Sequence, residues 1–199
     1  VDGVNADGGN NFFPAVIMDW VDGITLEGII RNLTSKNDIR SLRTLASNFL
    51  TLSQFLLSTD FSHGDLKHDN LIVGENLDLK LIDYDGLYVP ALADECSFEL
   101  GTKSFQHPNR KSEDFNEHID DFSILSIYVS LLAFSKYPSY YERFSDQQNL
   151  FFREEDFLLP VDSEIFNLLN QDNDLRPYVT CLLLSLNSDS IYIDNLSNI

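Results

Sequence analysis

The sequence is poor in cysteine, methionine, tryptophan and basic residues. It contains 2 cysteines, 1 methionine and 1 tryptophan in 199 residues. Cys96 and Cys181 are too few for a disulfide framework and lack the C-x-x-C spacing of zinc sites. The composition therefore suits a reducing compartment, and we expect a cytoplasmic protein.

The shortage of basic residues is the strongest compositional bias. With 13 lysines and arginines against 32 aspartates and glutamates, the formal net charge is −19. Such a charge repels the phosphates of nucleic acids and anionic membrane surfaces, so neither is an expected partner. The simplest role of the acidic residues is a solvated surface, although basic substrates would be attracted.

Long apolar runs are also missing. No run reaches the roughly 18 residues of a membrane-spanning helix, and no basic segment followed by an apolar one opens the chain. The length is sufficient for one domain, or for one large lobe of a two-lobed enzyme.

Several segments have the hydrophobic pattern of helices. Apolar side chains in residues 39–57 recur at three- and four-residue steps, which predicts an amphipathic helix. Residues 122–134 are apolar on nearly every side and predict a buried helix. The aromatic segment 137–160 predicts short helices packed on it, and capping signals predict helices through 169 and along 178–186. The apolar run 12–18 predicts a strand.

One polar stretch lies between apolar segments: His63-Gly64-Asp65-Leu66-Lys67-His68-Asp69-Asn70. The carboxylate of Asp65, the ammonium of Lys67 and the carboxamide of Asn70 do not follow the spacing of a helix or of a plain strand. This pattern predicts a catalytic loop. A second apolar run, from residue 79, ends in Asp83-Tyr84-Asp85-Gly86. Together the two stretches suggest a site for a metal ion and phosphate.

Each of these polar residues also has an ordinary interpretation. A single Asp, Lys or Asn in a turn serves solubility or bonds the nearby backbone, and only the combination favours chemistry. The histidines and acids of residues 63–69 could instead ligate a transition metal, but H-x-D-x-x-H-D matches no common zinc spacing.

The motifs H-G-D-L-K-x-x-N (63–70) and L-I-D-Y-D-G (81–86) resemble the catalytic and metal-binding motifs of the protein kinase superfamily. Residues 101–108, G-T-K-S-F-Q-H-P, resemble the G-T-x-x-Y-x-x-P that closes a kinase activation segment. Residues 120–123, D-D-F-S, resemble the D-x-W-S that opens the buried helix after it. Four motifs in family order, from about residue 12 to the end, make the resemblance specific.

The resemblance implies a mainly α architecture, α+β overall, with a small β-hairpin near the catalytic loop. Residues 1–22 would be the end of the N-terminal lobe and the hinge, and residues 23–199 the kinase-like C-terminal lobe. The catalytic loop would be 63–70, the metal motif 83–86 and the activation segment 83–110. The glycine-rich loop and strand-borne lysine of kinases find no match upstream. The resemblance thus implies a partner, the missing N-terminal lobe of the same chain, without which these residues would be inactive.

The resemblance assigns chemistry to individual residues. Asp65 would orient the acceptor hydroxyl and take its proton, and Lys67 would stabilise charge on the γ-phosphate of ATP. Asn70 and Asp83 would be oxygen ligands of Mg²⁺. Asp85 stands where kinases have glycine, and it would be an auxiliary metal ligand or a turn residue.

Further residues are implied to hold the nucleotide. Met18 matches the gatekeeper position, Asp19 and Val21 the hinge backbone that binds adenine, and Ile72 a residue that packs under it. The ordinary interpretation of Met18, Asp19 and Val21 is a strand and a turn, and that of Ile72 is a core residue. Asp120 is implied to tether the catalytic-loop backbone; its ordinary interpretation is an N-cap of the following helix, and the two roles are compatible.

Two departures from the family pattern carry predictions. Gly64 replaces the arginine that pairs with a phosphorylated activation loop, so activity should not depend on loop phosphorylation. In the family a glutamate after the proline of the activation segment pairs with an arginine. Here Asn109 stands at the glutamate position and Arg176 at the arginine position. Arg176 should therefore pair with another acceptor, Glu113 or Asp114.

The implied reaction is transfer of the γ-phosphoryl group of Mg-ATP to a hydroxyl, with a protein serine or threonine as the favoured substrate. The activation segment supports a protein substrate, whereas H-G-D and D-Y-D are closer to small-molecule phosphotransferases of the same superfamily. A pseudokinase that binds partners without turnover is the alternative from another class.

Overall fold

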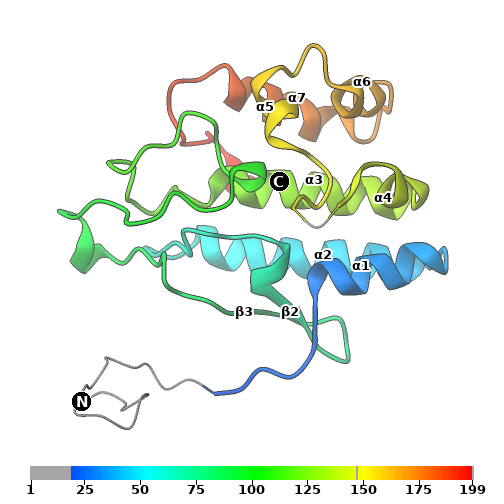
Figure 1. Cartoon of the computed structure of the whole chain (residues 1–199), viewed down its shortest axis with the longest axis horizontal. Coiled ribbons are helices and arrows are strands. Elements are labelled where there is room, and N and C mark those ends of the chain that lie inside the picture. The colour runs from blue at the N-terminus through cyan, green and yellow to red at the C-terminus, as the bar shows by residue number, and fades with distance from the viewer. Residues whose placement is uncertain (1–18, 147, 199) are drawn as a thin grey trace, which may run out of the picture.

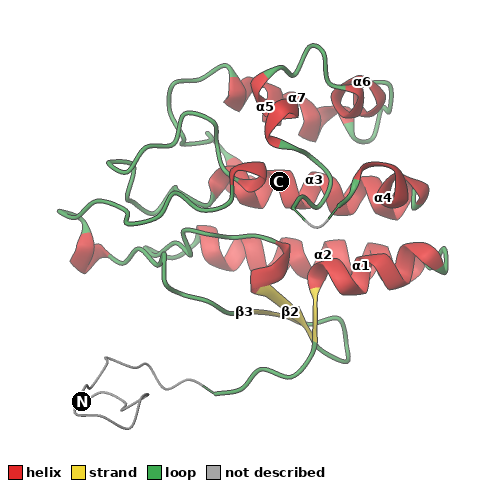
Figure 2. Ribbon diagram, in the orientation of Figure 1, coloured by secondary structure: helices red, strands yellow, loops and turns green. Residues whose placement is uncertain are grey.

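The computed structural model describes residues 19–146 and 148–198 and is mainly helical, with one small antiparallel sheet (Figures 1 and 2). The helices are α1 (Leu26–Ser35), α2 (Ile39–Leu57), α3 (Asp121–Lys136), α4 (Ser139–Phe144), α5 (Glu154–Leu158), α6 (Glu164–Asn170) and α7 (Arg176–Leu186). The strands are β1 (Ile24–Thr25), β2 (Leu71–Val73) and β3 (Leu79–Leu81). The strand predicted over residues 12–18 lies outside the described residues.

The sheet has the order β1-β2-β3, and both pairings are antiparallel. The β2–β3 hairpin, in which Leu71 faces Leu81, confirms the small hairpin expected after the catalytic loop. In β1, Ile24 pairs with Val73, so the stretch expected to be the hinge leads directly into the sheet. Figure 1 shows the sheet beside the layer of α1 and α2.

Helices α2 and α3 form the centre of the molecule and lie side by side (Figure 1). The helix predicted over 39–57 has those bounds, and Asp38 caps it by accepting a hydrogen bond from the Ser41 amide at 3.1 Å. The predicted buried helix extends over Asp121–Lys136. Of the described helices, none is both long enough and apolar enough to cross a membrane.

Buried serines let α3 pass through the core without unpaired hydroxyls. Ser126 and Ser130 donate to carbonyls of the preceding turn, at 3.1 and 2.7 Å. Ser123 donates to the Phe105 carbonyl at 2.7 Å and thereby joins α3 to the segment 101–110. The central helix therefore fixes both the core and the segment expected to close the activation loop.

The C-terminal segment after α7 packs against the start of α3. Ile191 and Ile193 are buried, and the Ile193 amide donates to Asp121 Oδ2 at 3.2 Å. Asp121 is 1 % exposed, and its Oδ1 has no hydrogen-bond partner among the described residues. Burial raises the pKa of Asp121 to about 7.

Candidate functional site

Asp120 holds the backbone at the start of residues 63–70, the predicted catalytic loop. Its carboxylate accepts hydrogen bonds from the amides of His63 and Gly64, the latter at 3.0 Å, across 56 residues of sequence. The side chain makes no capping hydrogen bond to α3. The tether predicted for Asp120 is therefore confirmed, and although Asp120 occupies the N-cap position of α3, its side chain does not cap the helix. Burial raises the pKa of Asp120, against the effect of the two amides.

Gly64 is where the catalytic loop meets Gly86 most closely. Its φ is +86°, and a Cβ built there would lie 2.1 Å from the Gly86 carbonyl oxygen. Only glycine satisfies both the backbone angle and the contact. The sequence H-G-D thus lets the loop lie directly against the segment that follows Asp83.

Asp65, Lys67 and Asn70 are in hydrogen-bond contact. Lys67 Nζ lies 2.6 Å from Asp65 Oδ2, and Asn70 Nδ2 lies 2.9 Å from the Asp65 carbonyl oxygen. The Thr102 amide donates to Asp65 Oδ1 at 2.8 Å and links the loop to the segment 101–110. Burial alone would raise the pKa of Asp65, but the hydrogen bonds from Lys67 and Thr102 bring it below the ordinary value. Asp65 is therefore a carboxylate at neutral pH.

Asp83 follows Ile82, whose amide and carbonyl both make hydrogen bonds to residues 63–70. The Ile82 amide donates to the Asn70 carbonyl at 3.0 Å, and His63 Nε2 lies 2.8 Å from the Ile82 carbonyl oxygen. Asp83 is exposed and has a φ of 65°, a conformation that non-glycine residues adopt mainly where surrounding structure imposes it. The neighbouring Asp85 is also exposed.

The oxygen atoms of Asn70 and Asp83 suit Mg²⁺ better than a transition metal. Within residues 19–146 and 148–198, no three His, Cys, Asp or Glu side chains gather to form a metal cage. Mg²⁺ commonly uses one or two protein oxygens and completes its shell with water and phosphate. One amide and one carboxylate, with Asp85 nearby in sequence, match that donor set. The transition-metal alternative for residues 63–69 gains no support.

Of the residues predicted to hold adenine, Ile72 lies in the sheet, and Asp19 and Val21 precede its first strand in the chain. Asp19 is exposed, and Val21 is half-buried just before β1. Ile72 in β2 is half-buried, and its Cγ2 lies 2.5 Å from the position that a Cβ on Gly23 would occupy. The sheet thus brings Ile72 next to the stretch expected to be the hinge. Met18, the predicted gatekeeper, lies outside the described residues.

Arg110 is a residue of this site that the sequence analysis missed. It is 6 % exposed, and its Nη1 donates to the Gly64 carbonyl at 2.7 Å and to Gln106 Oε1. Burial lowers the pKa of Arg110, and the negative charges of Asp120 and Asp65 oppose that effect. Arginine nevertheless stays charged in proteins. Arg110 therefore fastens the segment 101–110 to the catalytic loop with a buried cation.

The pairing predicted for Arg176 is wrong. Its Nε donates to the Asn170 carbonyl at 2.9 Å, and the Asp114 carboxylate accepts a hydrogen bond from the Lys111 amide at 2.8 Å. Arg176 is the first residue of α7, so its side chain reaches back to the end of α6 rather than across to residues 113–114.

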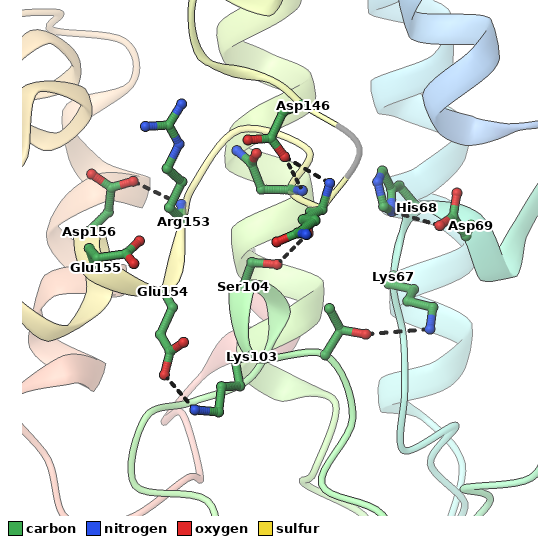
Figure 3. Close-up of a pocket in the computed structure, with 13 residues that line it drawn as sticks. Lys67, His68, Asp69, Lys103, Ser104, Asp146, Arg153, Glu154, Glu155 and Asp156 are labelled. Atoms are coloured by element: carbon green, nitrogen blue, oxygen red, sulfur yellow. Dashed lines mark hydrogen bonds and ion pairs between the residues drawn. The ribbon is translucent and has the colours of Figure 1, made fainter.

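A cavity of about 1000 Å³ opens beside Lys67 (Figure 3). It lies between the catalytic loop, residues 102–104 and residues 146–156. Lys103 pairs with Glu154 at 3.0 Å across one side of it. No protein-family model matches this sequence, and no curated protein is significantly similar to it. The chemistry of this site is therefore the basis for a functional assignment.

Proposed function

We propose that this chain is the catalytic lobe of a protein-kinase-like phosphotransferase that moves the γ-phosphoryl group of Mg-ATP to a serine or threonine hydroxyl of a protein. The observation that carries the proposal is the contact of Asp65 with both Lys67 and Asn70, together with the hydrogen bond from the Ile82 amide, one residue before Asp83, to the Asn70 carbonyl. Phosphoryl transfer needs a carboxylate at the attacking hydroxyl, a divalent cation on the phosphates and a positive charge near the transferred group. Asp65 and Lys67 would supply the carboxylate and the positive charge, and Asn70 and Asp83 would supply oxygen ligands for the cation.

Each residue has a distinct role in this proposal. Asp65, a carboxylate at neutral pH, orients the hydroxyl and accepts its proton as the oxygen attacks phosphorus. Lys67, already 2.6 Å from Asp65, offsets negative charge on the transferred group. Asn70 and Asp83 would hold Mg²⁺, which would neutralise negative charge on the phosphates while the bond between the γ-phosphorus and the leaving ADP breaks.

The nucleotide would lie along the sheet. In this proposal the adenine packs on Ile72 and binds the backbone near Asp19 and Val21, and an N-terminal lobe of the natural protein covers it from the other side. The proximity of Ile72 to Gly23 supports this placement, because Gly23 directly follows the stretch expected to bind adenine.

Arg110 supports activity that does not depend on phosphorylation of the activation segment. The buried guanidinium already joins the segment to the Gly64 carbonyl, and Thr102 already bonds Asp65. A phosphate is therefore not required as the link between segment and loop. A protein acceptor is favoured over a small molecule because residues 102–104 border a large cavity next to Lys67.

The test is transfer from γ-labelled ATP with Mg²⁺ by the natural full-length protein. Asp65→Asn should lower the rate by about 10²- to 10⁴-fold, the usual contribution of a general base, and Asp83→Asn should abolish Mg²⁺-dependent transfer. Asp94→Asn, an exposed acid outside the site, is the matched control and should keep the wild-type rate. Wild-type rates in both site variants would refute the assignment.

A further inference from the structure

The segment that follows α7, residues 188–196, lies against the start of α3, and we call it the strap. Its side chains of Ile191, Ile193 and Leu196 are buried, and most of the others are exposed. Figure 1 shows this end of the chain beside α3. The strap is therefore held by a small number of contacts.

The first of these contacts is made by Asp121, in the first turn of α3. The Ile193 amide donates to its Oδ2 at 3.2 Å, and within the described structure this is the single hydrogen bond that the carboxyl group receives. Its Oδ1 is buried and has no partner there. A neutral carboxyl group tolerates such a site much better than a carboxylate, because a buried charge needs several donors or a counter-charge.

The charged groups on the helix side of Asp121 do not stabilise its anion. The negative charges of Asp120, next to it on α3, and of Glu117, just before the helix, both disfavour ionisation. His118 Nδ1 lies 3.4 Å from Asp121 Oδ2 but makes no hydrogen bond to it in the described structure. The His118 side chain is 38 % exposed, so water competes with this contact.

The strap brings no cation to Asp121 either. Residues 188–196 include no lysine, arginine or histidine. Their ionisable side chains are Asp189, Tyr192 and Asp194, and all three are exposed. The Tyr192 ring packs edge-on against His118, with centroids 4.5 Å apart. A docked strap thus gives Asp121 one amide and an apolar cover.

Because the strap helps to bury Asp121, docking and protonation favour each other. Burial raises the pKa of Asp121 to about 7. When the strap is released, water reaches the carboxyl group and its pKa returns toward the ordinary value of about 4. The released state therefore binds fewer protons than the docked state between these pH values.

The second contact of the strap leads to the loop 63–70. Ile191 belongs to a buried cluster with Tyr88, Phe115 and Ile119. The Tyr88 amide donates to the Ser62 carbonyl at 2.8 Å, and the Ser62 amide donates back at 3.2 Å. Ser62 directly precedes His63.

The first contact leads to the same place. Asp121 is adjacent to Asp120, whose carboxylate accepts hydrogen bonds from the amides of His63 and Gly64. Both contacts of the strap therefore lie next to groups that support the start of the loop.

We propose that the strap is a pH-sensitive latch: a proton on Asp121 keeps residues 188–196 docked on α3, and loss of that proton releases them and loosens the start of the loop 63–70. The released fraction rises with pH between about 4 and about 7 and levels off above. This inference goes beyond the proposed function, because it concerns the conformation of the chain whatever reaction the loop supports.

The experiment is hydrogen exchange of the full chain, followed by mass spectrometry and corrected for the intrinsic rise of exchange with pH. Between about pH 5 and about pH 8, the opening constant of the strap amides should rise by about 10- to 100-fold. The peptide that contains His63 and Gly64 should change in the same direction. Asp121→Asn keeps a neutral group of the same shape, so in this variant the strap should stay protected and change by less than about twofold.

The matched control is Asp189→Asn, which removes one negative charge from an exposed position on the strap itself. It should keep the pH dependence of the wild type, and so should His118→Gln. Protection of the strap that is independent of pH in the wild type, or a wild-type pH dependence in Asp121→Asn, would overturn the proposal. Loss of the pH dependence in His118→Gln would overturn the assignment to Asp121.

Ile191→Ala tests the link between the strap and the loop. It removes packing from the cluster around Tyr88, so exchange should rise both in the strap and at His63 at about pH 5. Faster exchange in the strap with none at His63 would overturn the link. The measurement contains no nucleotide, so a failure of phosphoryl transfer would contradict the proposed function separately.

Discussion

Replacing Asp120 by alanine should destabilise the protein and release the catalytic loop. Asp120 is 3 % exposed and is the acceptor for the amides of His63 and Gly64. Each buried amide left without an acceptor costs about 1–3 kcal/mol, so the loss should be about 2–6 kcal/mol. Removing a carboxylate whose pKa burial has raised offsets part of that cost, which favours the lower half of this range.

Asp120→Asn gives an intermediate case. Its side-chain oxygen can accept one of the two hydrogen bonds, but its amide nitrogen would face the other donor. We expect a loss of about 1–3 kcal/mol, smaller than that of the alanine variant. Against a typical total stability of about 5–15 kcal/mol, both losses are readily measured.

Urea unfolding followed by far-UV circular dichroism gives the free energy of unfolding, because the protein is mainly helical. Hydrogen exchange at the His63 and Gly64 amides reports the release of the loop directly. Asp114→Ala is the control: it removes a half-buried carboxylate that also accepts a backbone hydrogen bond, from Lys111 at 2.8 Å. The control should lose less than about 0.5 kcal/mol. A loss below about 1 kcal/mol in Asp120→Ala, with unchanged exchange, would refute the tether.

Two further substitutions test the packing of the loop and the charge at the start of α3. Gly64→Ala, with a φ of +86° and a Cβ 2.1 Å from the Gly86 carbonyl oxygen, should lower stability in thermal unfolding by more than about 2 kcal/mol. In Gly86→Ala the added Cβ would be no closer than 3.3 Å to any other segment, so this variant should lose less than about 1 kcal/mol of stability. Equal losses of stability in the two variants would contradict the close contact between Gly64 and Gly86. Burial raises the pKa of Asp121 to about 7, so the native state keeps a proton that the unfolded chain releases near pH 4. The free energy of unfolding should therefore fall as pH rises from about 4 to about 7. Asp121→Asn should therefore gain about 2–3 kcal/mol relative to wild type between pH 5 and pH 8, and parallel pH profiles of unfolding would contradict this.

Features encoded by neighbouring residues were predictable from the sequence. The three- and four-residue spacing of leucines over 39–57 predicts α2, because one continuous apolar stripe has to face the core. The hairpin after Asn70 and the tether from Asp120 followed from motif spacing and family resemblance. In each case the signal is contained in a short stretch of sequence.

Contacts between distant segments were not predictable where no family motif marks the residues involved. Arg110 lies 46 residues from Gly64, and nothing around it in the sequence distinguishes a buried arginine from a surface one. The short helix α1, capped by Thr25, is a further element that the sequence analysis missed. The cavity beside Lys67 requires residues 67–69 and 146–156 to face each other, and only the packing of the helices establishes that.

The most direct test of the central claim is whether a metal–nucleotide complex binds at Asn70 and Asp83. The measurement is paramagnetic broadening of backbone amide signals in the ¹⁵N-labelled chain, with Mn²⁺ in place of Mg²⁺ and ATP in excess over metal. We predict that the signals of residues 65–70 and 82–85 broaden, that Asp83→Asn removes the effect, and that Asp78→Asn, an exposed acid in the β2–β3 turn, retains it. Broadening that is absent from these residues, or that persists in Asp83→Asn, would contradict the account.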